Sequence, residues 1–242
     1  MLNEHIKNPL ISLVIPCYNE ADNIPILVER CKSLVLNGEF EIIFVDNGST
    51  DGSGQLLQSF CREIPDFRIC TVRENRGYGY GIYQGIKLSR GSFIGWTHAD
   101  LQTDPADLAL APELIRKYGF YERLGIKGRR QIWRGWESIF TIGMSVVVFS
   151  VCRMWLWDIN AQPNIYHRKF LLNGVSPPND ANFDLYHYLR ASRDKFRFVR
   201  IRTHFHRRLF GVGSNELIFS KIRYCVNTIK FLGNECRLKC KN

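Results

Sequence analysis

The hydrophobic positions of the N-terminal half fall into four short runs, each followed by a polar loop. These runs are Ile11–Pro16, Glu41–Val45, Phe67–Val72 and Ser92–Trp96. They are continuous rather than alternating, which is typical of strands buried on both faces of a parallel sheet. The segments between them carry apolar residues at helical spacing, at Ile26–Leu34, Gly54–Arg62 and Tyr80–Ser89. This alternation of strand and helix predicts an α/β fold with a doubly wound, mostly parallel sheet.

Polar loops follow the predicted strands at the edge where such sheets bind ligands. The loops after the first, second and fourth strands contain Glu20, then Asp46 with Asp51, then Asp100 with Asp104. The loop that begins at Asp46 has two interpretations that the residues leave open. It can be a tight turn rich in Asp, Asn and Gly, or its carboxylate can accept hydrogen bonds from a nucleobase or ribose.

The loop from His98 to Pro105 carries the side chains best suited to a metal ion. His98 and Asp100 point the same way if the chain is extended, and the Gln102 amide follows. Imidazole, carboxylate and amide oxygen can together hold a divalent ion, which would neutralise a diphosphate. Asp104 and Pro105 also form a helix start, with Asp104 as the N-cap. We expect both features in this loop.

The middle of the chain changes character. Lys127–Trp136 is basic and aromatic, and Phe140–Trp157 is an apolar run with a single charge, Arg153. The apolar run is close to the minimum length for a transmembrane helix, and its charge lies near one end. We therefore expect a buried helix or one that lies on a membrane, in preference to a span.

The positive charge is concentrated at the C-terminal end. The chain carries a formal charge of +10, and from Arg190 onward it has 14 Lys and Arg against 3 Asp and Glu. Such an excess suits an anionic partner, either a phospholipid surface or a phosphorylated substrate. Nucleic acid is not expected, because no recognition motif accompanies the charge. The segment Glu216–Leu232 has apolar residues at helical spacing, so it is either an ordinary surface helix or an interfacial membrane helix.

Motifs in a fixed order resemble those of glycosyltransferase family 2, and within it the dolichol- and polyprenyl-phosphate sugar synthases. The matching segments are VIPCYNE (Val14–Glu20), VDNGSTDG (Val45–Gly52), ENRGYG (Glu74–Gly79), ADLQTDP (Ala99–Pro105), GRR with RxxxS (Gly128–Ser138), DINAQP (Asp158–Pro163), FDLY around Asp184, and RxxG (Arg208–Gly211). Each motif alone is weak, but the combination is specific and spans most of the chain.

The resemblance implies a GT-A fold, a nucleotide-sugar donor and a set of site residues. Nucleoside and phosphates would contact Pro16, Tyr18, Glu20, Asp46, Asn47, Arg129, Arg134 and Arg208. Asp100 and Gln102, with His98, would hold Mn2+ or Mg2+ on the diphosphate. Asp158 and Gln162 would lie near the sugar or acceptor, and Asp184 near the acceptor, which makes Asp158 and Asp184 the candidate catalytic residues. The family's single in-line displacement would invert the anomeric centre.

Two departures separate this chain from the family pattern. His98 stands where the family usually has the first acid of an Asp-x-Asp motif, and Asn47 replaces a second aspartate. Loss of a hard oxygen ligand should weaken Mg2+ more than Mn2+, which tolerates imidazole. His98 is also the feature that favours an alternative function, a catalytically silent nucleotide-binding scaffold in a glycan-assembly complex.

Taken together, the residues and the resemblance predict an inverting transferase that uses a UDP- or GDP-sugar. Its acceptor would be a polyprenyl phosphate or a lipid-linked glycan at the cytoplasmic face of a membrane. The polar N-terminus and unpaired cysteines favour a cytoplasmic protein held peripherally at the inner face of an anionic membrane. We expect a transferase domain over residues 1–215 and a basic amphipathic segment over residues 216–242.

Overall fold

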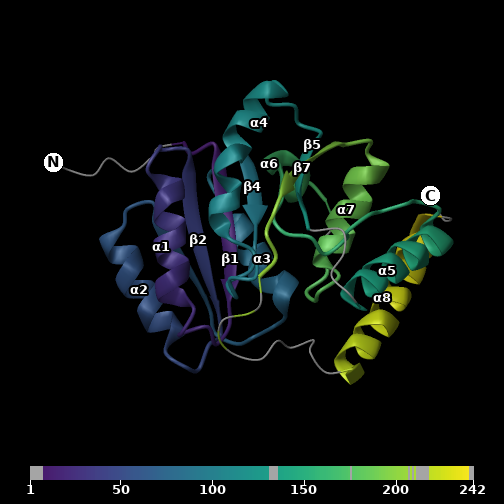
Figure 1. Cartoon of the computed structure of the whole chain (residues 1–242), viewed down its shortest axis with the longest axis horizontal. Helices are drawn as coiled ribbons and strands as arrows, with labels where there is room; N and C mark the ends of the chain where they lie inside the picture. The colour runs from purple at the N-terminus through teal and green to yellow at the C-terminus, as the bar shows by residue number, and fades with distance from the viewer. Residues whose placement is uncertain are drawn as a thin grey trace.

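The computed structural model describes residues 8–130, 136–174, 176–206, 208, 210 and 218–239. Within these residues the chain forms a seven-stranded sheet with helices on both faces (Figure 1). The strands are β1 (Ile11–Cys17), β2 (Phe40–Asn47), β3 (Phe67–Val72), β4 (Phe93–Trp96), β5 (Leu124–Arg129), β6 (Asn164–His167) and β7 (Arg197–Arg202). Their order across the sheet is β3-β2-β1-β4-β6-β5-β7.

The helices follow the strands along the chain and cover both faces of the sheet. They are α1 (Ile24–Val35), α2 (Ser53–Glu63), α3 (Tyr78–Leu88), the 3-10 helix η1 (Pro105–Leu110), α4 (Ala111–Lys117), α5 (Trp136–Cys152), α6 (Arg168–Leu172), α7 (Phe183–Arg193) and α8 (Ile218–Lys239). Helices α1, α2 and α4 contribute side chains to the core on one face, whereas α3, α6 and α7 contribute to the core on the other.

The predicted α/β class with a mostly parallel sheet is confirmed. Strand β1 pairs in parallel with β2 and β4, β2 pairs in parallel with β3, and β5 pairs in parallel with β7. Strand β6 runs antiparallel to both of its neighbours, β4 and β5. Strands β5, β6 and β7 were not predicted from the sequence, because charged or polar residues interrupt their apolar positions.

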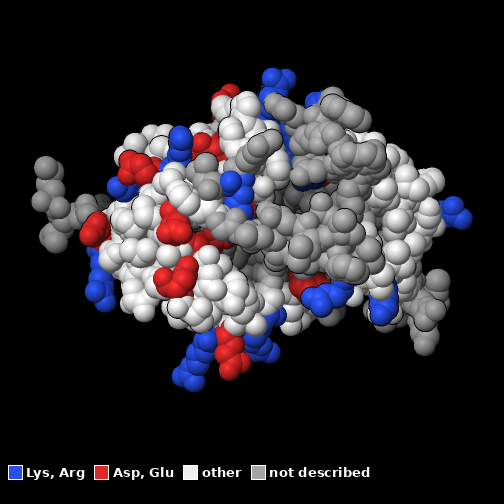
Figure 2. Space-filling view, turned by 60° about the horizontal axis from the view of Figure 1, so that its bottom comes forward, with Lys and Arg blue, Asp and Glu red and all other residues white. Residues whose placement is uncertain are grey.

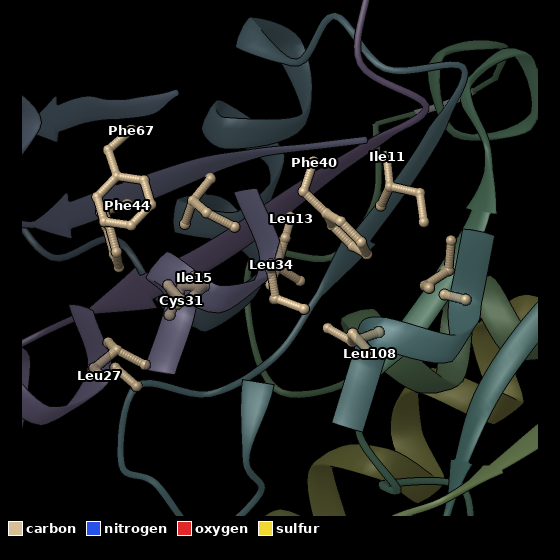
Figure 3. Close-up of a cluster of buried hydrophobic side chains, with 14 of the residues drawn as sticks. Ile11, Leu13, Ile15, Leu27, Cys31, Leu34, Phe40, Phe44, Phe67 and Leu108 are labelled. Carbon is tan, nitrogen blue, oxygen red and sulfur yellow. The ribbon is translucent and has the colours of Figure 1, made fainter. Parts of the chain in front are cut away.

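The core on the α1 face explains why the first strands are so apolar (Figure 3). Leu27, Cys31 and Leu34 of α1 pack against the side chains of β1 and β2, and all three are almost fully buried. The rings of Phe44 and Phe67 meet edge to face, with centroids 5.4 Å apart. This packing fixes the strands firmly, so the loops at their carboxyl ends start from a rigid edge.

Helices α5 and α8 lie side by side in Figure 1 and pack on α7. Met144 and Val148 of α5, Leu189 of α7 and Leu232 of α8 share one buried cluster. The apolar run and the basic C-terminal segment are therefore neighbours in space. Across the described residues, every helix is too short or too polar to cross a membrane. The expected domain boundary at residue 215 lies outside the described residues.

Candidate active site

The carboxyl ends of β1, β2 and β4 meet at the lower side of Figure 1, and their loops form one part of the candidate site. Figure 2 brings this side forward and shows acidic side chains gathered on it, with Arg and Lys side chains beside them. Asp46 at the end of β2 is 7% exposed, and its Oδ1 accepts the Ser49 backbone N–H at 3.0 Å. A Cβ on Gly54 would lie 2.4 Å from Asp46 Oδ2, so only glycine lets the first turn of α2 approach this carboxylate.

Hydrogen bonds join the loop after β1 to the loop after β2. Asn19 adopts a left-handed backbone with φ of 54°, and its Oδ1 accepts the Thr50 backbone N–H at 2.8 Å. The Glu20 backbone N–H donates to Ser53 Oγ at 2.9 Å. This pairing leaves the Tyr18 ring 46% exposed beside the half-buried Pro16. The two loops therefore act as one rigid unit with an aromatic ring at its surface.

Asn47, expected among the nucleotide contacts, instead joins two loops of the fold. Its side chain is 3% exposed, and its Nδ2 donates to Gly77 O at 3.1 Å and to Asn75 Oδ1 at 3.3 Å. The amide thus fixes the β3–α3 loop against the end of β2. An aspartate at this position would have no N–H to offer either acceptor.

The loop after β4 places its three predicted metal ligands in different surroundings. Asp100 Oδ1 accepts the Gln102 backbone N–H at 3.1 Å, while Oδ2 lies 3.9 Å from Arg208. The His98 ring stacks on the ring of Tyr78, with centroids 5.3 Å apart and an interplanar angle of 29°. In the part of the chain that the structure describes, no group of three or more His, Cys, Asp or Glu side chains is arranged to hold a metal ion.

Helix η1 begins where this loop ends. Asp104 accepts the Ala106 backbone N–H at 2.9 Å, and Pro105 is the first residue of the helix. The expected N-cap is therefore confirmed.

Arg208 brings two of the predicted carboxylates together. Its guanidinium pairs with Glu20 and lies near Asp100, although the two acids come from different loops. Burial raises the pKa of Glu20, and the hydrogen bond from Asn23 and the charge of Arg208 offset this only in part. A cation thus already occupies the space between the acids, which shows that this position favours positive charge.

Asp184 lies at the centre of a buried hydrogen-bond cluster on the other side of the site. Its Oδ1 accepts from Trp96 Nε1 at 2.6 Å, and its Oδ2 accepts from Gln162 Nε2 at 2.8 Å and from the Tyr78 hydroxyl at 3.4 Å. Burial raises the pKa of Asp184, opposed by the positive charges of Lys127 and His98 and by these donors. Both oxygens of Asp184 are therefore engaged.

Asp158 is likewise engaged, by Arg130. The Arg130 Nε donates to Asp158 Oδ1 at 2.8 Å, and the Arg130 backbone N–H donates to Oδ2 at 3.2 Å. Burial alone would raise the pKa of Asp158, but the Arg130 guanidinium outweighs it and holds the pKa below its usual value. Arg129, the expected phosphate contact, ends β5 with an exposed side chain, and Arg134 lies outside the described residues.

Four residues of the site were not singled out from the sequence: Tyr78, Trp96, Lys127 and Arg130. Tyr78 and Asp184 are separated by more than a hundred positions, so no local pattern connects them. Trp96 is the last residue of a buried strand, so the sequence pattern indicates only an ordinary core residue there. Lys127 and Arg130 belong to a basic run whose charges look solvated in the sequence. Only their burial identifies them.

Comparison with known proteins places this geometry in a family. The model of glycosyl transferase family 2 matches residues 12–137, just over half of the chain. A curated relative from Pseudomonas aeruginosa, undecaprenyl-phosphate 4-deoxy-4-formamido-L-arabinose transferase, is 38% identical over 137 residues, which are 53% of this chain and 39% of the relative. The transferase of the same name from Yersinia enterocolitica is 40% identical over 120 residues, covering 47% of this chain and 35% of its own. The chain thus spans well under half the length of these relatives.

Solved structures resemble the fold at low sequence identity. Glucosyl-3-phosphoglycerate synthase from Mycobacterium tuberculosis, in complex with Mn2+, UDP and glucosyl-3-phosphoglycerate, has a TM-score of 0.68 and 17% identity over 93% of this chain and 80% of its own. A mannosyltransferase from Pyrobaculum calidifontis with GDP-mannose and Mn2+ has a TM-score of 0.60 and 16% identity over 81% of this chain and 56% of its own. The strand order, the carboxylate loops and the matched motifs agree with these comparisons, and the chain belongs to glycosyl transferase family 2, with the GT-A fold.

Proposed function

We propose that this chain is the catalytic domain of an inverting glycosyltransferase that moves a sugar from a UDP- or GDP-sugar to a polyprenyl phosphate. The reaction would take place at the cytoplasmic face of a membrane. The curated relatives are named as undecaprenyl-phosphate sugar transferases, and they support this acceptor class. The observation that carries the proposal is that both candidate catalytic carboxylates are already hydrogen-bonded to donors of the protein itself.

Asp184 and Asp158 are both occupied by donors of the protein itself. Asp184 accepts from Trp96, Gln162 and Tyr78, and Asp158 is held by Arg130. An acceptor hydroxyl must lose a proton during attack, so it needs a base that it can reach, whereas Asp158 is 3% and Asp184 5% exposed. A phosphate monoester is already an anion near neutral pH and needs none. The arrangement therefore suits a phosphate acceptor, with the carboxylates orienting the site.

The donor would bind across the loops after β1, β2 and β4. Tyr18 offers an exposed ring for the base, with Pro16 and Asp46 beside it. Arg208 is placed to exchange its contacts with Glu20 and Asp100 for contacts with the diphosphate, because a guanidinium binds phosphate in the same bidentate way as carboxylate. Arg129 and Arg134 are further candidates for phosphate contacts.

A divalent ion would occupy the same place in exchange for the Arg208 guanidinium. The Asp100 carboxylate faces a cation there already, and Mn2+ accompanies the nucleotide in the similar solved structures. Asp100 and Gln102 would hold Mn2+ or Mg2+, with His98 as a third candidate ligand. When bound, the ion would neutralise charge that develops on the departing diphosphate.

The surface of α5 and α8 supports attachment to a membrane. Apolar side chains on both helices and on the segment after α5 are more than a third exposed, namely Ile142, Val146, Phe149, Trp155, Trp157, Val226 and Ile229. Arg153, Arg223 and Lys230 are exposed on the same elements. Apolar residues with basic neighbours are typical of helices that lie at an anionic membrane surface. This surface would bring the site to a lipid-borne acceptor.

The experiment compares two acceptors that differ only in the phosphate. Purified protein is given Mn2+, a panel of UDP- and GDP-sugars, and either undecaprenyl phosphate or undecaprenol in the same detergent. We expect release of nucleoside diphosphate and formation of a glycosylated lipid with the phosphate alone. Equal turnover of the alcohol would contradict the proposed acceptor. Nucleotide binding without turnover of either lipid would instead support a silent scaffold.

A further inference from the structure

Lys127 on β5 is a fully buried lysine whose ammonium group is saturated by acceptors. Its Nζ donates to Ile159 O at 2.8 Å, to Ala161 O at 3.0 Å and to Asn164 Oδ1 at 2.6 Å. These three bonds use the whole donor capacity of an ammonium group. A buried charge is costly unless it is fully hydrogen-bonded, so this placement is tolerated only because of that complete set.

The bond from Lys127 to Asn164 begins a chain of side-chain hydrogen bonds with a defined direction. Asn164 Nδ2 donates to Gln162 Oε1 at 2.9 Å. Gln162 Nε2 then donates to Asp184 Oδ2 at 2.8 Å and to the Tyr78 hydroxyl at 3.1 Å. Each amide accepts through its oxygen on one side and donates through its nitrogen on the other.

The two ends of the chain fix that direction. An ammonium group can only donate, so Asn164 must turn its oxygen toward Lys127 and its nitrogen toward Gln162. A carboxylate can only accept, so Asp184 requires the nitrogen of Gln162. Both ends therefore demand the same orientation of the two amides. Without the ammonium group, the Asn164 amide could turn and present its oxygen to Gln162, and the orientation of Gln162 would then depend on Asp184 alone.

We propose that Lys127 is a positioning residue for the sugar transfer proposed above, which it serves by orienting the Asn164 and Gln162 amides toward Asp184 and Tyr78. Its effect is confined to the acceptor side, because the Gln162 amide contacts Asp184 and the Tyr78 hydroxyl, whereas Glu20 and Asp100 are held by Arg208.

Two variants separate this role from a purely structural one. Lys127→Met removes the ammonium group but keeps a long buried side chain. Asn164→Asp keeps an oxygen for Lys127 but loses the N–H that donates to Gln162 Oε1. The Gln162 amide should therefore rotate so that its nitrogen faces the new carboxylate. We expect each variant to lower kcat by about 100-fold, the typical effect of small misplacement in an active site. The Kd for nucleoside diphosphate should stay near the wild-type value.

Arg200 provides the matched control. It is the partner of Lys127 across the β5–β7 pairing, and its guanidinium donates to Gly128 O, Trp157 O and the Tyr188 hydroxyl. Arg200→Met therefore removes a neighbouring cation with a similar number of hydrogen bonds but leaves the amide chain intact. We expect a lower Tm with kcat close to wild type. A loss of kcat as large as that of Lys127→Met would overturn the proposal.

A second readout does not depend on activity. The Trp96 indole N–H donates to Asp184 at 2.6 Å, so its proton resonance reports the state of that carboxylate. The signal is identified by its loss in Trp96→Phe. We expect it to shift in Lys127→Met and Asn164→Asp and to stay in place in Arg200→Met. An unchanged signal in Asn164→Asp would refute the role of Lys127, whereas a wild-type protein without transferase activity would refute only the proposed function.

Discussion

The two halves of the site are built in different ways. On the donor side, Glu20, Asp46 and Asp100 stand in loops that directly follow parallel strands, and solvent reaches the loop surface at Tyr18. On the acceptor side, Lys127 and Asp184 are buried and bonded to side chains from several elements. The donor side is therefore adjustable, because Arg208 can exchange partners there. The acceptor side is prebuilt, and its polar groups already have their partners.

Replacement of Asp100 with alanine should have the largest effect. It removes the carboxylate that would hold the metal ion, and we expect kcat to fall by about 1,000-fold, equivalent to about 4 kcal/mol in the transition state. The assay measures nucleoside diphosphate release at saturating donor. Asp104→Ala is the control, because it removes an N-cap worth about 1 kcal/mol of stability in the same loop. Near-normal turnover by the Asp100 variant would mean that the donor side does not depend on this acid.

Gly128→Ala should damage the acceptor side by moving its backbone. A Cβ at this position would lie 1.9 Å from Gln162 O, so the segment that carries Gln162 must shift. We expect a loss of about 3 kcal/mol in the free energy of unfolding, measured in denaturant, together with lower kcat. A Cβ on Gly143 would meet nothing within 4 Å, so Gly143→Ala should keep activity and gain up to about 1 kcal/mol. Wild-type stability in the Gly128 variant would show that the segment carrying Gln162 can move at no cost in free energy.

Activity should decrease as the pH rises through about 7, because burial lowers the pKa of Lys127 to about 7. Below this value the ammonium group holds the amide chain, and above it the neutral amine can accept as well as donate. The charges that face it are Asp184 from α7, Arg200 from β7, and Asp158 and Arg130 beside β6. We expect kcat to drop by about tenfold per pH unit above 7 if one proton is required.

The Lys127→Met variant shows whether the decrease of kcat above pH 7 is caused by loss of the proton from Lys127. Lys127→Met should have a low kcat that changes little between about pH 6 and pH 9, a range that includes the Lys127 pKa of about 7. If kcat of this variant still decreased with pH as in the wild type, the decrease would belong to another titrating group.

Membrane attachment should depend on α5 and α8 together. Removal of α8 would expose Leu232 and the buried cluster that it shares with α5, so point substitutions are the sharper test. Ile229→Ser and Phe149→Ser should each weaken the free energy of binding to anionic liposomes by about 1–2 kcal/mol, as expected for one apolar side chain that is buried in the membrane surface. Sedimentation with the liposomes measures this binding. Arg223→Gln and Lys230→Gln should each cost about 1 kcal/mol, and less as salt rises. Equal binding to neutral liposomes would contradict an electrostatic contribution.

His98→Asp should produce the smallest change. It restores the oxygen ligand common in the family, so activity with Mg2+ relative to Mn2+ should rise by about threefold. The assay is turnover at matched concentrations of each ion. An unchanged ratio would mean that His98 acts through its stack on Tyr78 and does not touch the ion.

Much of the donor side could be predicted from the sequence, because its signals are local. A strand buried on both faces must be continuously apolar, and Asp46 and Asp100 stand in the polar stretches that follow such apolar runs. The N-cap at Asp104 follows from the same local chemistry. The contacts of Asn47 with Gly77 and Asn75 could not be predicted, because those residues lie on a different loop, and its contact with the nucleotide stays a prediction.

The sequence by itself determined the fold class, the first four strands and the loops that hold the donor-side acids, since each depends on residues close together in the chain. Only the tertiary structure decided which basic residue is buried, that β6 runs antiparallel, and that α5 and α8 form one surface. Lys127, Asn164, Gln162, Tyr78 and Asp184 come from five separate elements or loops. Their hydrogen-bond directions follow from the contacts among them, and those contacts exist only once the sheet has brought distant segments together.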